Sequence, residues 1–272
     1  MELEGNIWVA FLLTLFAGLS TGIGGAIAFF AKRTNTRFLA AALGFSAGVM
    51  IYVSFVEILP KAFESLEGVL DGDMAALAGV LGFFGGMLVI GVIDRLVPSF
   101  ENPHELHAVE ELRDEKRKAI DRKSLHRMGI MSALAIAIHN FPEGLVTFMA
   151  AMKDPALGVT IAIAIAIHNI PEGIAVSVPL YYATGSRKKA FWYSFLTGLA
   201  EPVGAVVGFF ILRALMGDAV FGIVFASVAG IMVFISLDQL LPTAERYGEH
   251  HLCMYGVVAG MTVMAASLII LG

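Results

Sequence analysis

Residues 136–144 of this sequence read Ile-Ala-Ile-His-Asn-Phe-Pro-Glu-Gly, and residues 165–173 read Ile-Ala-Ile-His-Asn-Ile-Pro-Glu-Gly. Eight of the nine positions are identical. Each copy lies in the middle of a mainly apolar run, and a run of about 20 apolar residues is long enough to cross a bilayer as a helix. Small apolar residues often repeat by chance in membrane proteins, but chance does not explain a shared His-Asn-x-Pro-Glu-Gly. The two copies therefore predict a pair of related membrane helices.

The composition of the whole chain supports this setting. Of 272 residues, 58% are hydrophobic and 15% are charged, against about 45–50% and about 25% in an average soluble domain. We therefore predict an all-α integral membrane protein. Residues 1–6 are acidic and lead directly into a long apolar run, whereas a cleavable signal peptide has a basic leader, so we expect the first span to be retained. The single cysteine, Cys253, excludes an internal disulfide and argues against a thiolate site for copper(I).

Eight apolar runs, separated by charged or turn-forming residues, predict eight transmembrane helices. The expected spans are Ile7–Ala31, Phe38–Leu59, Met74–Val97, Met128–Ala151, Ala156–Tyr182, Ala190–Leu215, Ala219–Leu241 and Leu252–Leu271. Fifteen of the eighteen Lys and Arg residues fall in the first, third, fifth and seventh loops. By the positive-inside rule these loops are cytoplasmic, so both termini are expected outside a multi-pass plasma-membrane protein.

One long hydrophilic segment, residues 98–127, separates the third and fourth spans. It includes a mixed-charge stretch that is either helical or disordered, and it is too short for a catalytic domain. We therefore treat residues 1–272 as a single transmembrane domain with a cytoplasmic loop at 98–127. His104 and His107 in this loop have side chains that can bind a metal ion, but we expect them to be solvated loop residues.

Further repeats link the spans on either side of the motif pair. The second span has Ala47-Gly48-Val-Met50 with Ser54 and Leu59-Pro60, and the seventh has Ala229-Gly230-Ile-Met232 with Ser236 and Leu241-Pro242. A weaker echo relates Gly18, Gly24 and Phe29-Phe30 of the first span to Gly198, Gly204 and Phe209-Phe210 of the sixth. The related spans run in opposite directions through the membrane. This predicts a 3+2+3 arrangement with inverted repeats, as in many secondary transporters that bind substrate near the midplane.

Five ionisable residues are expected near span centres: His139, Glu143, His168, Glu172 and Glu201. Each buried charge costs about 2.5–3.5 kcal/mol on insertion scales, so the cluster needs a compensating partner. The spacing of four within each motif places its imidazole and carboxylate on one helix face. If the two helices pack together, a divalent cation, or two, would neutralise the three carboxylates. Nitrogen and oxygen ligands of this mixture suit zinc, iron(II), manganese, cobalt or cadmium.

Other polar residues have weaker assignments. Asn140 and Asn169, beside the histidines, could join the metal shell or orient its ligands. Glu57, Asp94 and Asp238 lie nearer the span ends, where pathway residues and hydrated boundary residues are both plausible. A lone intramembrane histidine can also serve an interhelical hydrogen bond. Pro142 and Pro171 each remove a helical hydrogen bond and are expected to kink their helices.

These residues carry a family resemblance. The paired motifs in the fourth and fifth of eight helices resemble the ZIP (Zrt/Irt-like) metal transporter family, and the doubled histidine is similar to its bacterial zinc-uptake branch, ZupT. The resemblance implies a two-metal site formed by His139, Asn140, Glu143, His168, Asn169, Glu172 and Glu201. It also implies a thioether position at Met50, and a cytoplasmic route past Asp94 and Asp238.

The same resemblance implies uptake into the cytoplasm across a bacterial inner membrane. It implies a homodimer in which a central bundle of four helices moves against the rest. The partners we expect are therefore divalent metal ions, the lipid bilayer and a second copy of the chain, with no nucleic acid. We expect no resident cofactor, because the bound metal is the cargo.

Two other function classes remain to be weighed against a carrier. An intramembrane metalloprotease would need a motif such as His-Glu-x-x-His, which the sequence lacks. A cation channel could use the same carboxylates, although the inverted repeat favours a carrier. The sequence also lacks a Gly-x-x-x-x-Gly-Lys-Ser/Thr loop for ATP. We therefore predict a divalent-metal transporter that is not an enzyme.

Overall fold

The structure, a computed structural model, describes residues 6–30, 36–96, 118–212, 217–247 and 250–271. Within these ranges the chain is helical and contains no strand. Its elements are α1 (Ile7–Phe30), α2 (Thr36–Val53), η1 (Ser54–Ile58), α3 (Leu59–Glu67), α4 (Gly72–Leu96), α5 (Lys118–Lys153), α6 (Pro155–Thr184), α7 (Arg187–Gly198), α8 (Ala200–Leu212), α9 (Asp218–Ile235), η4 (Ser236–Leu240), α10 (Leu241–Tyr247) and α11 (His250–Leu271).

Seven segments of the described chain are long and apolar enough to cross a membrane. They are Ile7–Ile27, Arg37–Glu67, Gly72–Arg95, Pro155–Ile174, Arg187–Phe210, Asp218–Glu245 and His250–Ile270. The prediction of an all-helical membrane protein is therefore confirmed at this level. The expected span Met128–Ala151 lies within α5 and is not one of the seven. Helix α5 begins at Lys118, so the last ten residues of the expected loop 98–127 are helical.

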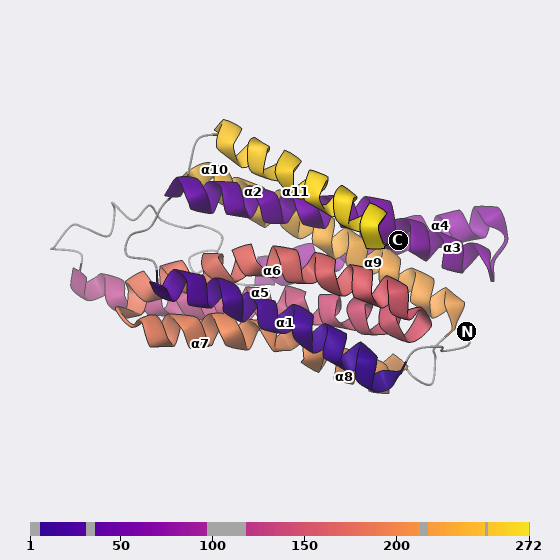
Figure 1. Cartoon of the computed structure of the whole chain (residues 1–272), viewed down its shortest axis with the longest axis horizontal. Helices are drawn as coiled ribbons and strands as arrows, with labels where there is room; N and C mark the ends of the chain where they lie inside the picture. Colours follow the sequence, from indigo (N-terminus) through magenta and orange to yellow (C-terminus); the bar gives the residue numbers. More distant parts are fainter. Residues whose placement is uncertain (1–5, 31–35, 97–117, 213–216, 248–249, 272) are drawn as a thin grey trace.

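The helices form two groups (Figure 1). We call α1, α5, α6, α7 and α8 the central bundle, because each packs on several of the others. Helices α2, α3, α4, α9, α10 and α11, with the π-turns η1 and η4, form the flanking bundle, in which α2 packs on α11 and α9 packs on α4. The two bundles meet where α2 and α11 contact α6 and where α9 contacts α5.

At one end of the molecule, a lysine of the central bundle also reaches the flanking bundle. Lys153 Nζ lies 2.8 Å from Ser65 Oγ of α3 and 3.3 Å from Asp218 Oδ1 of α9. The same ammonium group lies 4.1 Å from the centre of the Phe221 ring. The end of α5 is thereby tied to two flanking helices by an ion pair, a hydrogen bond and a cation–π contact.

Proline positions explain where the long helices change geometry. Both α2 and α9 end in a π-helical turn, η1 or η4, and each turn is followed at once by Leu-Pro, which contains Pro60 or Pro242. Proline lacks an N–H and its ring crowds the carbonyl four residues earlier, so a wider turn relieves that crowding. Helices α7 and α8 are separate at Leu199, three residues before Pro202. Helices α5 and α6 continue through Pro142 and Pro171, where we expect them to be kinked.

The closest helix contacts occur in matched pairs. In each, a glycine lies so near a neighbouring helix that an added Cβ would overlap a backbone carbonyl oxygen. The glycine and carbonyl residues are Gly144 with Glu201 and Gly173 with Thr21 in the central bundle, and Gly86 with Ser227 and Gly260 with Phe45 in the flanking bundle. The spacing of 180 residues from Thr21 to Glu201 is also the spacing from Gly18 to Gly198. The packing therefore repeats as the sequence does.

Candidate metal site

The two motif copies lie in α5 and α6, which pack against each other inside the central bundle. The seven residues predicted from the sequence to bind metal are all buried, none with more than 3% of its surface exposed. They are His139, Asn140, Glu143, His168, Asn169, Glu172 and Glu201. Because charged and amide side chains are rarely buried without a partner, such a group in a membrane protein is a candidate functional site.

Each histidine pairs with the glutamate of the other motif. His139 Nε2 lies 3.4 Å from Glu172 Oε2, and His168 Nε2 lies 3.4 Å from Glu143 Oε2. The i,i+4 spacing places histidine and glutamate on one face of each helix, as expected. The pairing, however, runs between the helices and joins the two motifs crosswise.

The asparagines connect the motifs to the neighbouring helices. The Asn169 amide donates to the Ala17 carbonyl of α1, at 3.0 Å, and to Glu201 Oε1 of α8. The Asn140 amide donates to the carbonyl of Thr197 in α7, at 3.3 Å. These bonds use the amide nitrogens and leave the amide oxygens as acceptors.

Several buried acceptor atoms of this group have no hydrogen-bond partner within the described part of the protein. They are Oε1 of Glu143, Oε1 of Glu172, Oε2 of Glu201, and Oδ1 of Asn140 and Asn169. A buried acceptor without a donor costs about 1–3 kcal/mol, and more if it is charged. Five such oxygens in one buried group make a strongly electron-rich region that a cation would stabilise.

The candidate residues meet in pairs and not in threes. Among the described residues, no three His, Cys, Asp or Glu side chains are placed to hold a metal ion together. The 3.4 Å between nitrogen and oxygen in each crosswise pair is close to the roughly 3.3 Å that separates two donors of one tetrahedral zinc with bonds of about 2.0–2.1 Å. Binding a metal ion would therefore require a further donor to approach one of these pairs.

The residues predicted from the sequence to lie along a pathway are dispersed over the flanking bundle. Met50 of α2 is fully buried in its apolar core. Glu57, in the π-turn η1, is half-buried and has Lys61 as its oppositely charged neighbour. Asp94 of α4 accepts a hydrogen bond from the amide of Gln239, at 3.1 Å, whereas Asp238 is exposed. His104 and His107 lie outside the described residues.

Three further polar residues lie near these groups and were not predicted from the sequence. The buried hydroxyl of Thr21 has no partner in the described structure, and its repeat spacing to Glu201 could have identified it. Gln239 is 182 residues after Glu57, and the same spacing separates Gly48 from Gly230. Gln239 is therefore the repeat counterpart of Glu57. Ser46 of α2 donates to the carbonyl of His168, at 3.2 Å, and no sequence pattern marks it.

Long apolar helices around buried histidines and carboxylates define a multi-pass membrane protein of the transporter class. The sequence profile of the ZIP Zinc transporter family matches residues 5–268. The zinc transporter ZupT of Nitratidesulfovibrio vulgaris is 64% identical over 273 residues, with 98% of each chain covered. The ZupT of Lysinibacillus sphaericus is 60% identical over 99% of this chain and 100% of its own, and that of Clostridium perfringens is 58% identical over 97% and 96%.

The chain therefore belongs to the ZIP family, which makes it a membrane transporter of divalent metal ions and not an enzyme. The resemblance stated from the sequence is confirmed. The metalloprotease alternative is excluded by the same finding.

Proposed function

We propose that this chain carries zinc, and also iron(II), manganese, cobalt and cadmium, into the cytoplasm through a midplane site. The ligands we assign are His139, Asn140, Glu143, His168, Asn169, Glu172 and Glu201. Zinc is supported by the relatives, which are named as zinc transporters. The wider range of metals is supported by the ligand chemistry, because nitrogen and oxygen donors of this mixture accept all of these ions.

One observation carries this proposal: five acceptor oxygens from three helices are buried in one bundle without donors. A hydrogen-bond donor satisfies one or two of them, whereas a divalent cation can bind several at once. The two histidines add neutral nitrogen ligands, each 3.4 Å from a carboxylate oxygen with which it could share a metal ion. With Asn169 already joined to Glu201, the group offers enough donors for one metal ion, or for two that share carboxylates.

The burial of the ligands favours a carrier over a cation channel. A conducting channel exposes its filter to water, whereas here every proposed ligand is at most 3% exposed. Transport then requires a change of conformation, as in secondary transporters whose bundles rock around a fixed site. Saturation of the flux at high metal concentration would separate the two mechanisms.

We further propose that α5 is an eighth span and that the chain is a single domain of 3+2+3 helices with inverted repeats. The matched glycine contacts and the two π-turns support this arrangement. The distribution of Lys and Arg supports cytoplasmic odd-numbered loops, including residues 98–117, with both termini outside the bacterial inner membrane. In Figure 1, α1 begins and α11 ends at the same end of the bundle, as an even number of spans requires.

The remaining assignments rest mainly on the resemblance. We propose Met50 as a thioether contact to the metal, and Glu57, Asp94 and Asp238 as pathway residues. The Asp94–Gln239 hydrogen bond supports a polar connection between α4 and η4. We also propose a homodimer, as the family resemblance implies.

Uptake into proteoliposomes tests the proposal. Protein purified in detergent is reconstituted with an internal zinc-sensitive dye, and the initial rate is measured against external free zinc. We expect saturable uptake by the wild type, and flux that never saturates would instead support a channel. Tags at Asp71 and Arg187 test the orientation, because we expect external access to the first and cytoplasmic access to the second.

A further inference from the structure

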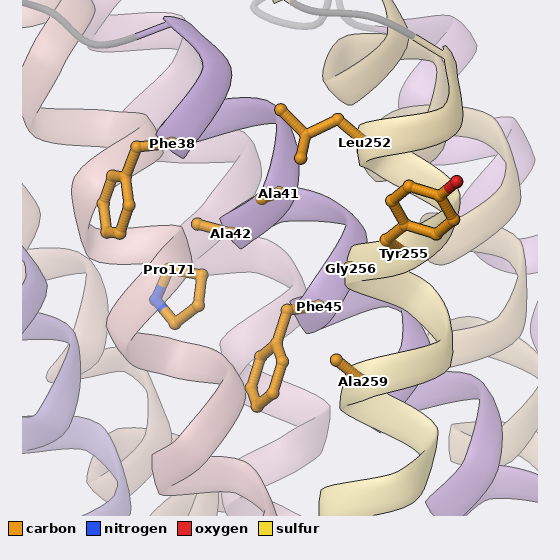
Figure 2. Close-up of a pocket in the computed structure, with 9 residues that line it drawn as sticks. All are labelled: Phe38, Ala41, Ala42, Phe45, Pro171, Leu252, Tyr255, Gly256 and Ala259. Carbon is orange, nitrogen blue, oxygen red and sulfur yellow. The ribbon is translucent and has the colours of Figure 1, made fainter.

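A groove lies at the boundary between the two bundles, between α2, α6 and α11 (Figure 2). Its volume is about 440 Å³. Helix α2 provides one wall, in which Phe38, Ala42 and Phe45 recur at helical spacing, and α11 provides the other, which includes Tyr255 and Ala259. Pro171 of the second motif is its contact on the central bundle. Apart from the Tyr255 hydroxyl, the lining side chains are apolar.

The groove exists because α2 and α11 pack closely on each other, whereas α6 does not pack as closely on them. Helices α2 and α11 approach so tightly that a Cβ at Gly256 or Gly260 would overlap a carbonyl oxygen of α2. Ala42 and Ala259 are too small to fill the space next to this seam. Figure 2 shows the rings of Phe38 and Phe45 extending from α2 on the side of α6, where Pro171 has only its compact ring.

The position of the groove selects its occupant. Helices α2, α6 and α11 all contain segments able to cross a membrane, so the groove opens toward hydrocarbon, and apolar cavities do not retain water. Phe38 and Tyr255, at 53% and 68% exposure, are its outermost rings. A flexible chain can fill the space between such rings, whereas a helix of a second copy, about 10–12 Å across, cannot enter it.

One end of the groove carries the features of a membrane interface. Tyr255 lies in the second turn of α11. Its ring stacks on that of His251, with the ring centres 6.4 Å apart. Tyrosine is enriched at the level of lipid headgroups, because it combines an apolar ring with a polar hydroxyl. An amphiphile whose polar end lies beside Tyr255 would extend its apolar part toward Phe45 and Ala259.

We propose that this groove binds one acyl chain of a bilayer phospholipid, held between the two bundles against Pro171. The acyl chain supplies dispersion contacts to the side chains that line the groove. The acyl chain would lie next to the candidate metal site. Pro171 directly precedes Glu172, and Phe45 directly precedes Ser46, whose hydroxyl donates to the His168 carbonyl. The lipid-binding claim does not depend on metal transport, so the two proposals can fail separately.

Photolabelling tests the proposal. The full-length protein is reconstituted in liposomes of phosphatidylglycerol and phosphatidylethanolamine that contain a phosphatidylcholine with a diazirine on its acyl chain. After illumination, labelled peptides are quantified by mass spectrometry. We expect the groove segments, 38–45 and 252–259, to be labelled more strongly than the exposed face of α4 at 80–88, which reports non-specific lipid contact.

A pair of matched variants provides the control. Ala259→Leu extends a side chain into the groove, whereas Ala266→Leu, two turns later on α11, adds the same atoms at an exposed position outside it. We expect groove labelling to fall to the level of α4 in Ala259→Leu and to stay unchanged in Ala266→Leu. Both variants should melt within a few degrees of the wild type in detergent.

Three results would overturn the proposal. They are equal labelling of the groove and α4 in the wild type, undiminished labelling in Ala259→Leu, and crosslinking of two copies through a cysteine introduced at Ala259. The last result would show that a second copy covers the groove.

Discussion

The central and flanking bundles are packed alike but differ in what they bury. Both rely on glycines that touch the backbone of a neighbouring helix, at Gly144 and Gly173 in one and at Gly86 and Gly260 in the other. Within the described chain, every fully buried glutamate and histidine belongs to the central bundle. The buried polar residues of the flanking bundle are neutral: serines, Gln239 and Thr243.

This difference shows that close packing and buried charge have separate roles. Tight glycine contacts hold helices together in lipid, where the hydrophobic effect does not drive helices to associate. Buried carboxylates lower the stability of the protein. Because they are restricted to one bundle, we infer that they have a function there, and that bound cargo offsets their cost. We propose, as the family resemblance implies, that the flanking bundle is the frame against which the central bundle moves.

The largest effect should follow from removing one buried charge of the central bundle. Glu143→Gln and Glu172→Gln keep the side-chain volume but remove an anionic ligand, so we expect saturable zinc uptake to be lost at low metal concentration. The proteoliposome assay measures this directly. Glu67→Gln, at an exposed position of α3, is the matched control and should transport normally. Normal uptake by both buried variants would mean that the charges of the central bundle do not bind the cargo.

Acid should weaken the apparent affinity for zinc, with a smaller effect than the loss of a buried carboxylate. Free histidine titrates near pH 6.5, and metal must displace any proton that its ligands hold, so protons compete with zinc at His139 and His168. Each proton displaced lowers apparent affinity by up to about tenfold per pH unit. We expect a weaker apparent affinity at pH 5.5 than at 7.5, measured at fixed free zinc. Equal affinities would argue that these histidines are not ligands.

Packing variants should affect the two bundles equally. Gly144→Ala and Gly230→Ala each place a Cβ against a backbone carbonyl oxygen, of Glu201 and of Phe83, and we expect each to destabilise the protein by about 1–3 kcal/mol. Gly85→Ala, with no atom near its added Cβ, should not destabilise it. Denaturant unfolding in mixed micelles measures these differences. A destabilised Gly85→Ala, or an unaffected Gly230→Ala, would contradict the shared packing rule.

The smallest effect should come from the link between the bundles. Lys153→Met removes the ion pair between Lys153 and Asp218. The side chain of Lys153 is 30% exposed and that of Asp218 is 32% exposed. Partly exposed pairs of this kind contribute about 0.2–1 kcal/mol, so we expect a small loss of stability in the same unfolding assay. Lys188→Met, at an exposed position near the start of α7, controls for the loss of charge. If both variants lose the same stability, the link to Asp218 contributes nothing.

Much of the fold could be predicted because apolar runs and their separating residues have a length set by the bilayer. The helix bounds nevertheless differ where local backbone chemistry intervenes. The expected second span ended at Leu59, whereas the helical segment continues through η1 and α3 to Glu67. A hydropathy pattern does not register that a π-turn can carry a helix past Leu59-Pro60.

For the candidate site, sequence spacing indicated the residues but not their partners. The i,i+4 rule places His139 and Glu143 on one face of α5, yet it does not say which side chain of α6 lies opposite. The antiparallel packing of α5 on α6 decides that, and it brings His139 to Glu172. Ser46 could not have been predicted, because a single serine on an apolar helix has no periodic signal.

Equilibrium zinc binding tests the central claim most directly, because it does not depend on the conformational change or on the energy source. Protein purified in detergent is titrated with zinc by calorimetry, and the zinc-bound form is examined by X-ray absorption. We predict at least one bound zinc per chain with mainly nitrogen and oxygen ligands and at most one sulfur ligand, from Met50, and loss of this site in the double variant Glu143→Gln/Glu172→Gln but not in Glu67→Gln. Unchanged stoichiometry and affinity in that double variant would contradict the account, since zinc would then bind elsewhere in the protein.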